Sequence, residues 1–248
     1  MPSWEAGAEA YRDLEQGGNA PDVARLSDRT ETEMSLALAG LTGMKARAMG
    51  SYLAVRRVAS GSIAIVGWEG DEEAVAERRR ATTAVLRRHG GAPLGSSPGR
   101  AWAKGRFHAP YLRDELLGRG VMVETLETAT TWSNLQRLYA AVREALGRHA
   151  PLVACHISHL YPSGSSLYFT FLAHQEQEDR IGQWQRVKAA ACEAIVAAGG
   201  TITHHHAIGR DHRQYLQSEA GAPGIAALRA AKTALDPAGI MNPGKLLP

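Results

Sequence analysis

Apolar residues along the chain follow two spacings, which alternate between short β-branched runs and longer segments with helical periodicity. The short runs predict strands, because successive side chains of a strand point to opposite faces. We expect strands over residues 23–27, 62–68, 120–128, 152–160 and 166–172. Helical spacing is clearest in residues 131–148, where Leu135, Leu138, Val142 and Leu146 form one apolar face. The pattern therefore predicts a mixture of strands and amphipathic helices.

Residues typical of helix termini mark several of the expected helices. The first helix, within residues 2–17, has Ser3 as its N-cap and ends at Gly17-Gly18. The helix from Asp71 to His89 has acidic residues in its first turn and basic residues in its last, which matches the helix dipole. Further helices are expected over residues 30–41, 131–148, from about 180 to 198, and 222–235. Residues 93–105, rich in Gly, Pro and Ser, are expected to be irregular.

The two halves of the chain repeat one order of elements: a strand, an acidic turn, a long helix and a Gly-Gly pair. This order predicts an α+β fold in which an antiparallel sheet is backed by helices, with a duplication of two ferredoxin-like units. The segments after the two Gly-Gly pairs would then leave equivalent positions of the sheet. The first carries Arg106, His108 and Arg113, and the second carries His204–His206, Arg210 and His212. We expect both segments to reach one cleft.

Composition limits the classes of protein to which the chain can belong. Its 248 residues are 44% hydrophobic, which is enough to build a core, and no apolar run approaches the roughly 20 residues of a membrane span. Residues 1–17 mix Glu, Arg and Asp with apolar positions, so they are not a signal peptide. Two isolated cysteines predict no disulfide framework and fit a reducing compartment. A net charge of +3 gives no nucleic-acid footprint.

The strongest chemical signal is the run of three histidines from His204 to His206. Imidazole changes charge near neutral pH, so such a cluster can donate, accept or relay protons, or bind a metal. If the backbone continues the β-type run of residues 200–203, His204 and His206 share one face and His205 points the other way. A surface histidine run is the alternative. We expect no metal, because zinc needs a third ligand from elsewhere and Cys155 and Cys192 lack paired ligand spacing.

Two further side chains allow both a structural and a functional interpretation. Arg25 lies between apolar neighbours in a strand, so it is either a solvated edge residue or a buried functional group. Tyr168 either packs the sheet as a strand aromatic or faces a cleft, with Leu167 and Phe169 on the opposite side. The pattern alone does not separate these alternatives.

Three segments together resemble the FAD-linked oxidases of the vanillyl-alcohol oxidase type. They are the histidine run His204–Arg210, the hairpin Cys155–Phe169 and the tail Leu235–Lys245. The tail is similar to that of many members of this superfamily, including D-lactate and glycolate dehydrogenases. The triple histidine and the hairpin with Tyr168 resemble the alkyldihydroxyacetonephosphate synthases more narrowly. The resemblance covers nearly the whole chain, from about Pro2 to its end.

This resemblance implies that residues 1–248 form the C-terminal substrate, or cap, domain of a flavoenzyme, without the N-terminal FAD-binding domain. FAD would then be bound mainly by a missing segment or a partner chain, since residues 93–105 offer no Gly-rich phosphate loop between a strand and a helix. The implied activity is a transfer in ether-lipid synthesis, in which a fatty alcohol replaces the acyl group of acyl-dihydroxyacetone phosphate. Oxidation of a 2-hydroxy acid such as D-lactate or glycolate, and a non-catalytic, free-standing cap domain, are the alternatives.

The resemblance also implies roles for individual residues. Tyr168 matches the tyrosine that donates and accepts the proton, and His204, His205 and His206 match the histidines required for activity, with His205 expected nearest to flavin and substrate. Arg25 matches another arginine important for activity. Arg113 matches the substrate-binding arginine, for which a surface ion pair with Asp114 or Glu115 is the alternative. His156 and His159 match no assigned role, and we expect them to be structural.

The implied partners are a lipid phosphate substrate and a separate FAD-binding domain or chain, with a second copy of the chain as an open alternative. The expected location is the cytoplasm, either free or peripheral to a membrane.

Overall fold

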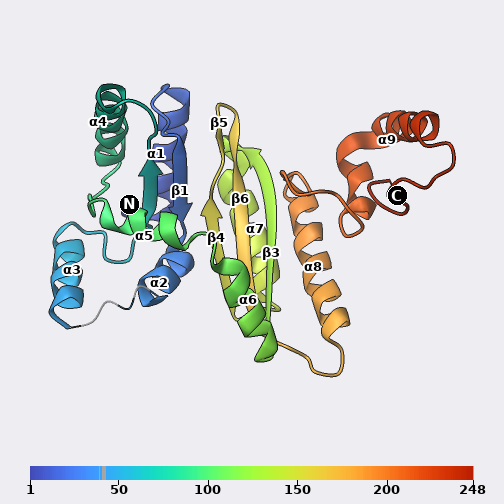
Figure 1. The fold of residues 1–248 in the computed structure, drawn as a ribbon, viewed down its shortest axis with the longest axis horizontal. Coiled ribbons are helices and arrows are strands. Elements are labelled where there is room, and N and C mark those ends of the chain that lie inside the picture. The colour runs from blue at the N-terminus through green and yellow to red at the C-terminus, as the bar shows by residue number, and fades with distance from the viewer. Residues whose placement is uncertain (39, 41–42, 248) are drawn as a thin grey trace.

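The structure is a computed structural model that describes residues 1–247 apart from residues 39, 41 and 42 (Figure 1). Its helices are α1 Trp4–Gln16, α2 Arg29–Leu38, α3 Gly43–Val55, α4 Glu72–Arg88, α5 Ser97–Gly105, α6 Ala109–Gly118, α7 Leu135–Gly147, α8 Arg180–Ala197 and α9 Leu216–Leu235, with short 3-10 turns at Trp132–Asn134 and Arg213–Tyr215. Its strands are β1 Val23–Ser27, β2 Ala64–Gly67, β3 Val121–Thr131, β4 Leu152–Ile157, β5 Leu160–Tyr161 and β6 Gly164–His174.

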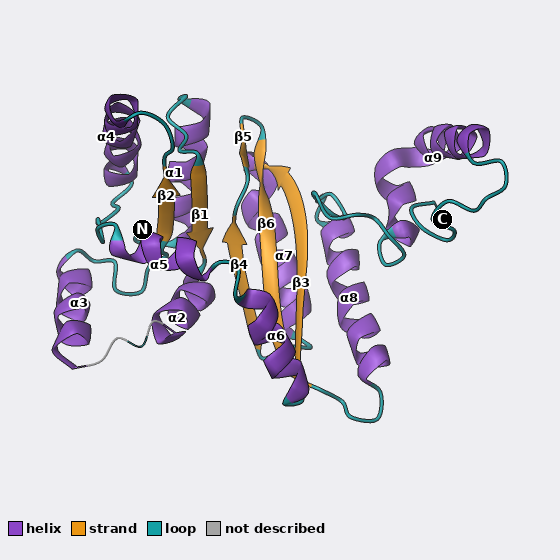
Figure 2. Cartoon of the chain, viewed as in Figure 1, coloured by secondary structure: helices purple, strands orange, loops and turns teal. Residues whose placement is uncertain are grey.

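The strands form one antiparallel sheet in the order β2-β1-β4-β6-β3, and β5 pairs with the start of β6. Its longest ladder joins β3 to β6, from the pair Val121 and His174 to the pair Thr131 and Gly164. Figure 2 shows the strands side by side, with helices packed around them. The expected α+β fold is therefore confirmed, whereas the duplication of ferredoxin-like units stays a prediction.

One face of the sheet is apolar and packs against helices. Leu167, Phe169 and Phe171 alternate along β6 and are fully buried. They belong to one core cluster with Leu138 of α7 and Ile195 of α8. In Figure 1, α7 lies behind the sheet, and α6 crosses the other face near the lower end of β3, β4 and β6. The alternation along each strand therefore directs a second set of side chains to the face opposite α7.

Several local expectations hold because they depend on short-range chemistry. As expected, Ser3 caps α1 by accepting a hydrogen bond from the Ala6 amide at 3.1 Å. Asp71, expected as the first residue of its helix, is the N-cap of α4 and accepts from the Ala74 amide at 3.0 Å. The irregular segment expected over residues 93–105 is wrong, because α5 covers most of it. Pro98 lies in the first turn of α5, where a helix needs no backbone N–H donor. Within the helix expected over residues 30–41, residues 39 and 41 lie outside the described residues.

The second Gly-Gly pair ends α8 and fastens the following loop to the edge of β3. Gly200 packs so closely that a Cβ atom there would lie 2.8 Å from Leu138 Cδ2. The next amide, Thr201 N–H, donates to Ala129 O at 2.9 Å. The β-type run expected at residues 200–203 is not a strand, so the histidines that follow are free of strand alternation.

Two expectations drawn from composition concern membrane-spanning segments and the cysteines. Across the described residues, none of the helices has both the length and the apolar character that crossing a bilayer requires. Cys155 and Cys192 are buried free thiols.

Candidate active site on the polar face of the sheet

Strand register places four of the polar side chains in one row across the sheet. Glu127 of β3 pairs with Tyr168 of β6, and Tyr168 pairs with His156 of β4. His156 in turn pairs with Ser27 of β1, and Arg25 lies two residues earlier on the same side of that strand. This row lies on the face opposite Phe169 and the apolar core.

At the β1 end of the row, the side chains of Arg25, His156 and Glu31 of α2 contact one another. Arg25 Nη1 lies 3.0 Å from His156 Nε2, and Arg25 Nη2 lies 2.7 Å from Glu31 Oε1. His156 Nδ1 lies 2.9 Å from the same Glu31 oxygen. A guanidinium only donates, so His156 Nε2 must accept and His156 Nδ1 must carry the proton that it donates to Glu31. His156 is therefore a neutral imidazole of fixed tautomer.

The same contacts shift the pKa values of His156 and Glu31. Burial lowers the pKa of His156, and the nearby charge of Arg25 lowers it further, which outweighs the opposing effect of Glu31. Burial alone would raise the pKa of Glu31, but the His156 hydrogen bond and charge and the Arg25 charge hold it at about 2. Since His156 is neutral by geometry, we assign the lasting stabilisation of the Glu31 carboxylate to Arg25.

Tyr168 packs against the His156 ring of this three-residue contact. Its ring stacks on His156, with centroids 4.8 Å apart and planes inclined by 22°, and the edge of His206 approaches at 5.9 Å between centroids. Tyr168 is half-buried, while its neighbours Leu167 and Phe169 are fully buried on the other side of the sheet. Within the part of the chain that the structure describes, its hydroxyl makes no hydrogen bond. The phenol is thus presented on the polar face.

The three histidines all face the carboxylate of Glu127, whose side chain is completely buried. His204 Nδ1 lies 3.3 Å from Oε1, and His205 Nδ1 and His206 Nε2 lie 2.8 and 3.7 Å from Oε2. The expected alternation, with His205 pointing away, is wrong because the backbone bends at these residues. The 2.8 Å contact lacks hydrogen-bond geometry, so Oε2 of this buried carboxylate has no hydrogen-bond partner among the described residues.

A fourth imidazole completes the group around Glu127. His159 Nδ1, from the turn after β4, lies 3.4 Å from Oε1, and its ring lies about 5 Å from those of His204 and His205. The nearest donor atoms of Glu127, His159, His204 and His205 all lie within 4.8 Å of one another. These are ligand types that metal ions use, and also groups between which protons can move.

The segment with Arg113 lies apart from these contacts. Arg113 is on α6, with its side chain 48% exposed and Nη1 4.0 Å from Asp114 Oδ1. His108 contacts the Tyr111 ring edge-on, and Arg106 lies over Trp102 and Phe107. None of the contacts found among residues 1–247, with the gaps given above, joins this segment to the histidines. The expected meeting of the two segments in one cleft is not seen here.

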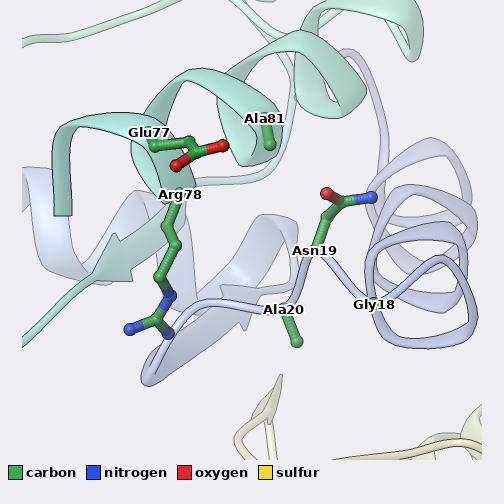
Figure 3. A pocket seen from close by; sticks show the side chains of 6 residues that line it. All are labelled: Gly18, Asn19, Ala20, Glu77, Arg78 and Ala81. Atoms are coloured by element: carbon green, nitrogen blue, oxygen red, sulfur yellow. The ribbon is translucent and has the colours of Figure 1, made fainter. Parts of the chain in front are cut away.

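A surface hollow lies elsewhere, near the N-terminal helix. It is a cavity of about 170 Å³ between α4 and the turn after α1, lined by Asn19, Ala20, Glu77 and Arg78, among others (Figure 3). Arg78 already pairs with Asp22 at 2.6 Å. Its guanidinium is therefore engaged, and we assign the chemistry to the open polar face instead.

Glu31, Glu127 and His159 are the site residues that sequence patterns did not identify. Glu127 shares its strand with a second acid, Glu124, so the sequence gives no signal that singles it out. His159 was expected to be structural. Only the fold brings these residues to the histidines.

Comparison with known proteins gives consistent matches over the whole chain. The family model for the C-terminal domain of FAD-linked oxidases matches residues 1–246. Alkyldihydroxyacetonephosphate synthases of Trypanosoma brucei brucei and Dictyostelium discoideum are 31% and 29% identical over 262 and 261 residues, which is 100% of this chain and 43% of each relative. A solved alkyldihydroxyacetonephosphate synthase superimposes with a TM-score of 0.73 at 26% identity, covering 98% of this chain and 42% of that one. The chain thus spans less than half the length of these relatives.

Proposed function

This chain belongs to the FAD-linked oxidases through their C-terminal domain, and from that membership we propose that residues 1–248 form the substrate domain of an alkylglycerone-phosphate synthase-like transferase. The reaction would exchange the acyl group of acyl-dihydroxyacetone phosphate for a fatty alcohol. Relatives named alkyldihydroxyacetonephosphate synthase, matched over the full chain, support this choice of reaction. Because the lipid substrates partition into bilayers, a cytoplasmic position against a membrane surface is part of the same proposal.

The observation that best supports an acid-base site is the setting of Tyr168. Its phenol stands on the polar face, between the stacked imidazole of His156 and the edge of His206. A free phenol ionises only near pH 10, so a phenol that moves protons at neutral pH needs such neighbours. Tyr168 would hold and pass the proton, and His206 would exchange it. General acid-base help of this kind contributes on the order of 10²–10⁴ in rate.

The other proposed residues have two kinds of role: some would contact the substrate, and others would hold those residues in position. His204 and His205 would contribute imidazoles beside His206, and the carboxylate of Glu127 would orient all three. Arg25 would act through His156, since it fixes that imidazole neutral beneath the phenol. Arg25 is therefore a positioning residue in this proposal.

Arg113 is proposed to bind the phosphate of the substrate. Its side chain is half exposed, and its contact with Asp114, at 4.0 Å, is too long to hold the guanidinium firmly. A free guanidinium can grip phosphate through two parallel charge-assisted hydrogen bonds. Movement of α6 or of the side chain would be needed for Arg113 and Tyr168 to contact one substrate.

In this proposal the described residues contact only one end of FAD. Their glycines do not form the loop between a strand and a helix whose amides would surround a pyrophosphate. The polar face with Tyr168 and His206 would accept the flat ring system instead. When bound, the flavin supplies a ring that exchanges electron pairs with the substrate carbon. We therefore propose that FAD is held mainly by another domain or a partner chain.

An assay of the flavin-completed protein tests this function. We expect labelled fatty alcohol to enter the glycerone-phosphate product without net reduction of the flavin. Bleaching of the flavin by D-lactate or glycolate, without exchange, would instead favour a 2-hydroxy-acid oxidase. If the chain takes up no FAD when combined with a flavin domain, and neither reaction occurs, the alternative of a non-catalytic domain is favoured.

A further inference from the structure

Four donor groups from three separate parts of the chain converge at the edge of the sheet. Glu127 comes from β3, His159 from the turn after β4, and His204 and His205 from the loop after α8. The imidazoles present Nδ1 toward the carboxylate. Segments so distant in sequence meet here around one buried negative charge, which is the arrangement that a cation site requires.

Three of the separations between these donors are close to those of tetrahedral coordination. With Zn–N and Zn–O bonds of about 2.0–2.1 Å, neighbouring ligands of a tetrahedral zinc ion lie roughly 3.3–3.4 Å apart. Glu127 Oε1 lies 3.3 Å from His204 Nδ1 and 3.4 Å from His159 Nδ1. The two Nδ1 atoms of His204 and His205 are 3.2 Å apart. All four donor atoms lie within 4.8 Å of one another, so small side-chain shifts would bring the set to the spacing of one ion's ligands.

The carboxylate itself has unmet bonding capacity. The Glu127 side chain has no exposed surface, and its Oε2 has no hydrogen-bond partner within the described residues. A buried carboxylate oxygen without a partner is unfavourable, because burial removes its hydration. A cation held between Glu127 and the imidazoles would supply the missing interaction.

One outer contact suits a histidine that binds a metal, whereas the contacts of another would have to rearrange. Such histidines usually donate their second ring nitrogen to another group, and the Tyr161 hydroxyl lies 3.0 Å from His204 Nε2. The Ser158 and Ser166 hydroxyls lie 3.1 and 3.3 Å from His159 Nδ1. They are also 3.2 Å from each other, so they can bond to one another when that nitrogen binds an ion.

We propose that Glu127, His159, His204 and His205 bind one Zn²⁺ ion through a carboxylate oxygen and three Nδ1 atoms. Three imidazole nitrogens and one oxygen in a tetrahedron are a donor set typical of zinc. His206 stays outside the set, with Nε2 3.7 Å from Glu127 and its ring against Tyr168. The zinc site does not depend on the proposed transferase activity, although the bound ion would leave His206 as the imidazole beside Tyr168.

Calorimetry on the protein, purified without a histidine tag and stripped with EDTA, tests the site. Titration with ZnCl₂ should show one ion bound per chain. Glu127→Gln keeps the shape of the side chain and removes its charge, and His204→Ala removes one ligand. Each should weaken zinc binding by at least about 100-fold, since even second-shell changes cost about 10–100-fold. Absence of saturable binding, or unchanged affinity in Glu127→Gln, would overturn the proposal.

Control variants separate ligand loss from other effects. His174→Ala also removes one histidine, but from the exposed end of β6, six residues from Tyr168, and should keep the wild-type affinity. If Glu127→Gln fails to fold, judged by circular dichroism, His205→Ala at an exposed position gives the same test. Co²⁺ in the wild-type protein should show the intense visible bands of tetrahedral geometry, and weak octahedral bands would count against the site.

The proposed zinc site and the proposed transferase function can be disproved independently. Zinc affinity is measured without flavin or substrate, so it does not depend on transferase activity. His206→Ala should leave zinc affinity unchanged while lowering the transfer rate of the flavin-completed protein. Zinc binding that requires His206 would contradict the ligand set.

Discussion

The imidazole of His156 lies flat against the phenol of Tyr168, with ring centroids 4.8 Å apart. This contact joins the proposed proton-transfer residue to a group whose charge is already fixed. Arg25 donates to one nitrogen of His156, and the other nitrogen donates to Glu31. The ring beneath Tyr168 is therefore held neutral and cannot easily rotate. Arg25 and Glu31 thus hold the ring against which the phenol packs.

The first prediction concerns the stability of this contact. Arg25→Met should lower the free energy of unfolding by about 3 kcal/mol, because it leaves the buried Glu31 carboxylate without its cation. Urea unfolding followed by circular dichroism measures the change. Arg29→Met is a matched control, since Arg29 pairs with Glu33 where both side chains are more than half exposed. It should cost less than about 1 kcal/mol, and equal losses in both variants would contradict this account.

A second prediction concerns the loss of folding stability at acidic pH. Because the pKa of Glu31 in the folded protein is about 2, below its ordinary value of 4.5, its ionised form stabilises the fold above pH 4.5. That contribution is lost as the pH falls from 4.5 toward 2. Unfolding free energies measured from pH 7 to pH 3 should fall less steeply in Glu31→Gln than in the wild-type protein. Parallel curves below pH 4.5 would show that Glu31 is not the responsible group.

The thiols give a third prediction. Burial raises the pKa of Cys155 well above its ordinary value, and burial raises that of Cys192 to about 11. Since the thiolate is the reactive form, neither cysteine should react with a disulfide reagent at pH 8 in the native protein. Both should react once urea unfolds the chain. Rapid labelling of either thiol in the native state would mean that the core around it opens.

The substrate-binding role of Arg113 gives a fourth prediction. Arg113→Lys keeps the charge but loses the paired geometry of the guanidinium, which is worth about 1.5–3 kcal/mol for a charge-assisted hydrogen bond. In the flavin-completed protein, KM for the acyl substrate should rise by about 10-fold or more, with a smaller change in kcat. A kcat loss at constant KM would place Arg113 in the chemical step instead.

The elements that could be predicted from sequence depend on nearby residues. The cap at Ser3 and the alternation of Leu167, Tyr168 and Phe169 involve contacts within a few positions. The sequence does not predict helix α5, because Gly, Pro and Ser favour turns, although Pro98 is well suited to a first helical turn. The composition of residues 93–105 is compatible with either a loop or a helix.

The site could be predicted only in part, because its partners are distant in sequence. Glu31 and His156 are 125 residues apart, and Glu127 and His204 are 77 residues apart. No spacing rule connects such pairs. The predicted orientation of His205 is wrong for a related reason. The hydrogen bond from the Thr201 amide to Ala129 O of β3, together with the bends that follow, sets the path of the loop.

The most direct test of the proposed function is the turnover of Tyr168→Phe in the flavin-completed protein. This substitution removes only a hydroxyl that makes no hydrogen bond within the described part of the chain, so folding and the stacking on His156 should be preserved. We predict that the exchange of acyl group for fatty alcohol falls by at least about 100-fold, with unchanged thermal unfolding. Near-normal turnover in the folded variant would contradict the assignment of Tyr168 as the proton-transfer residue.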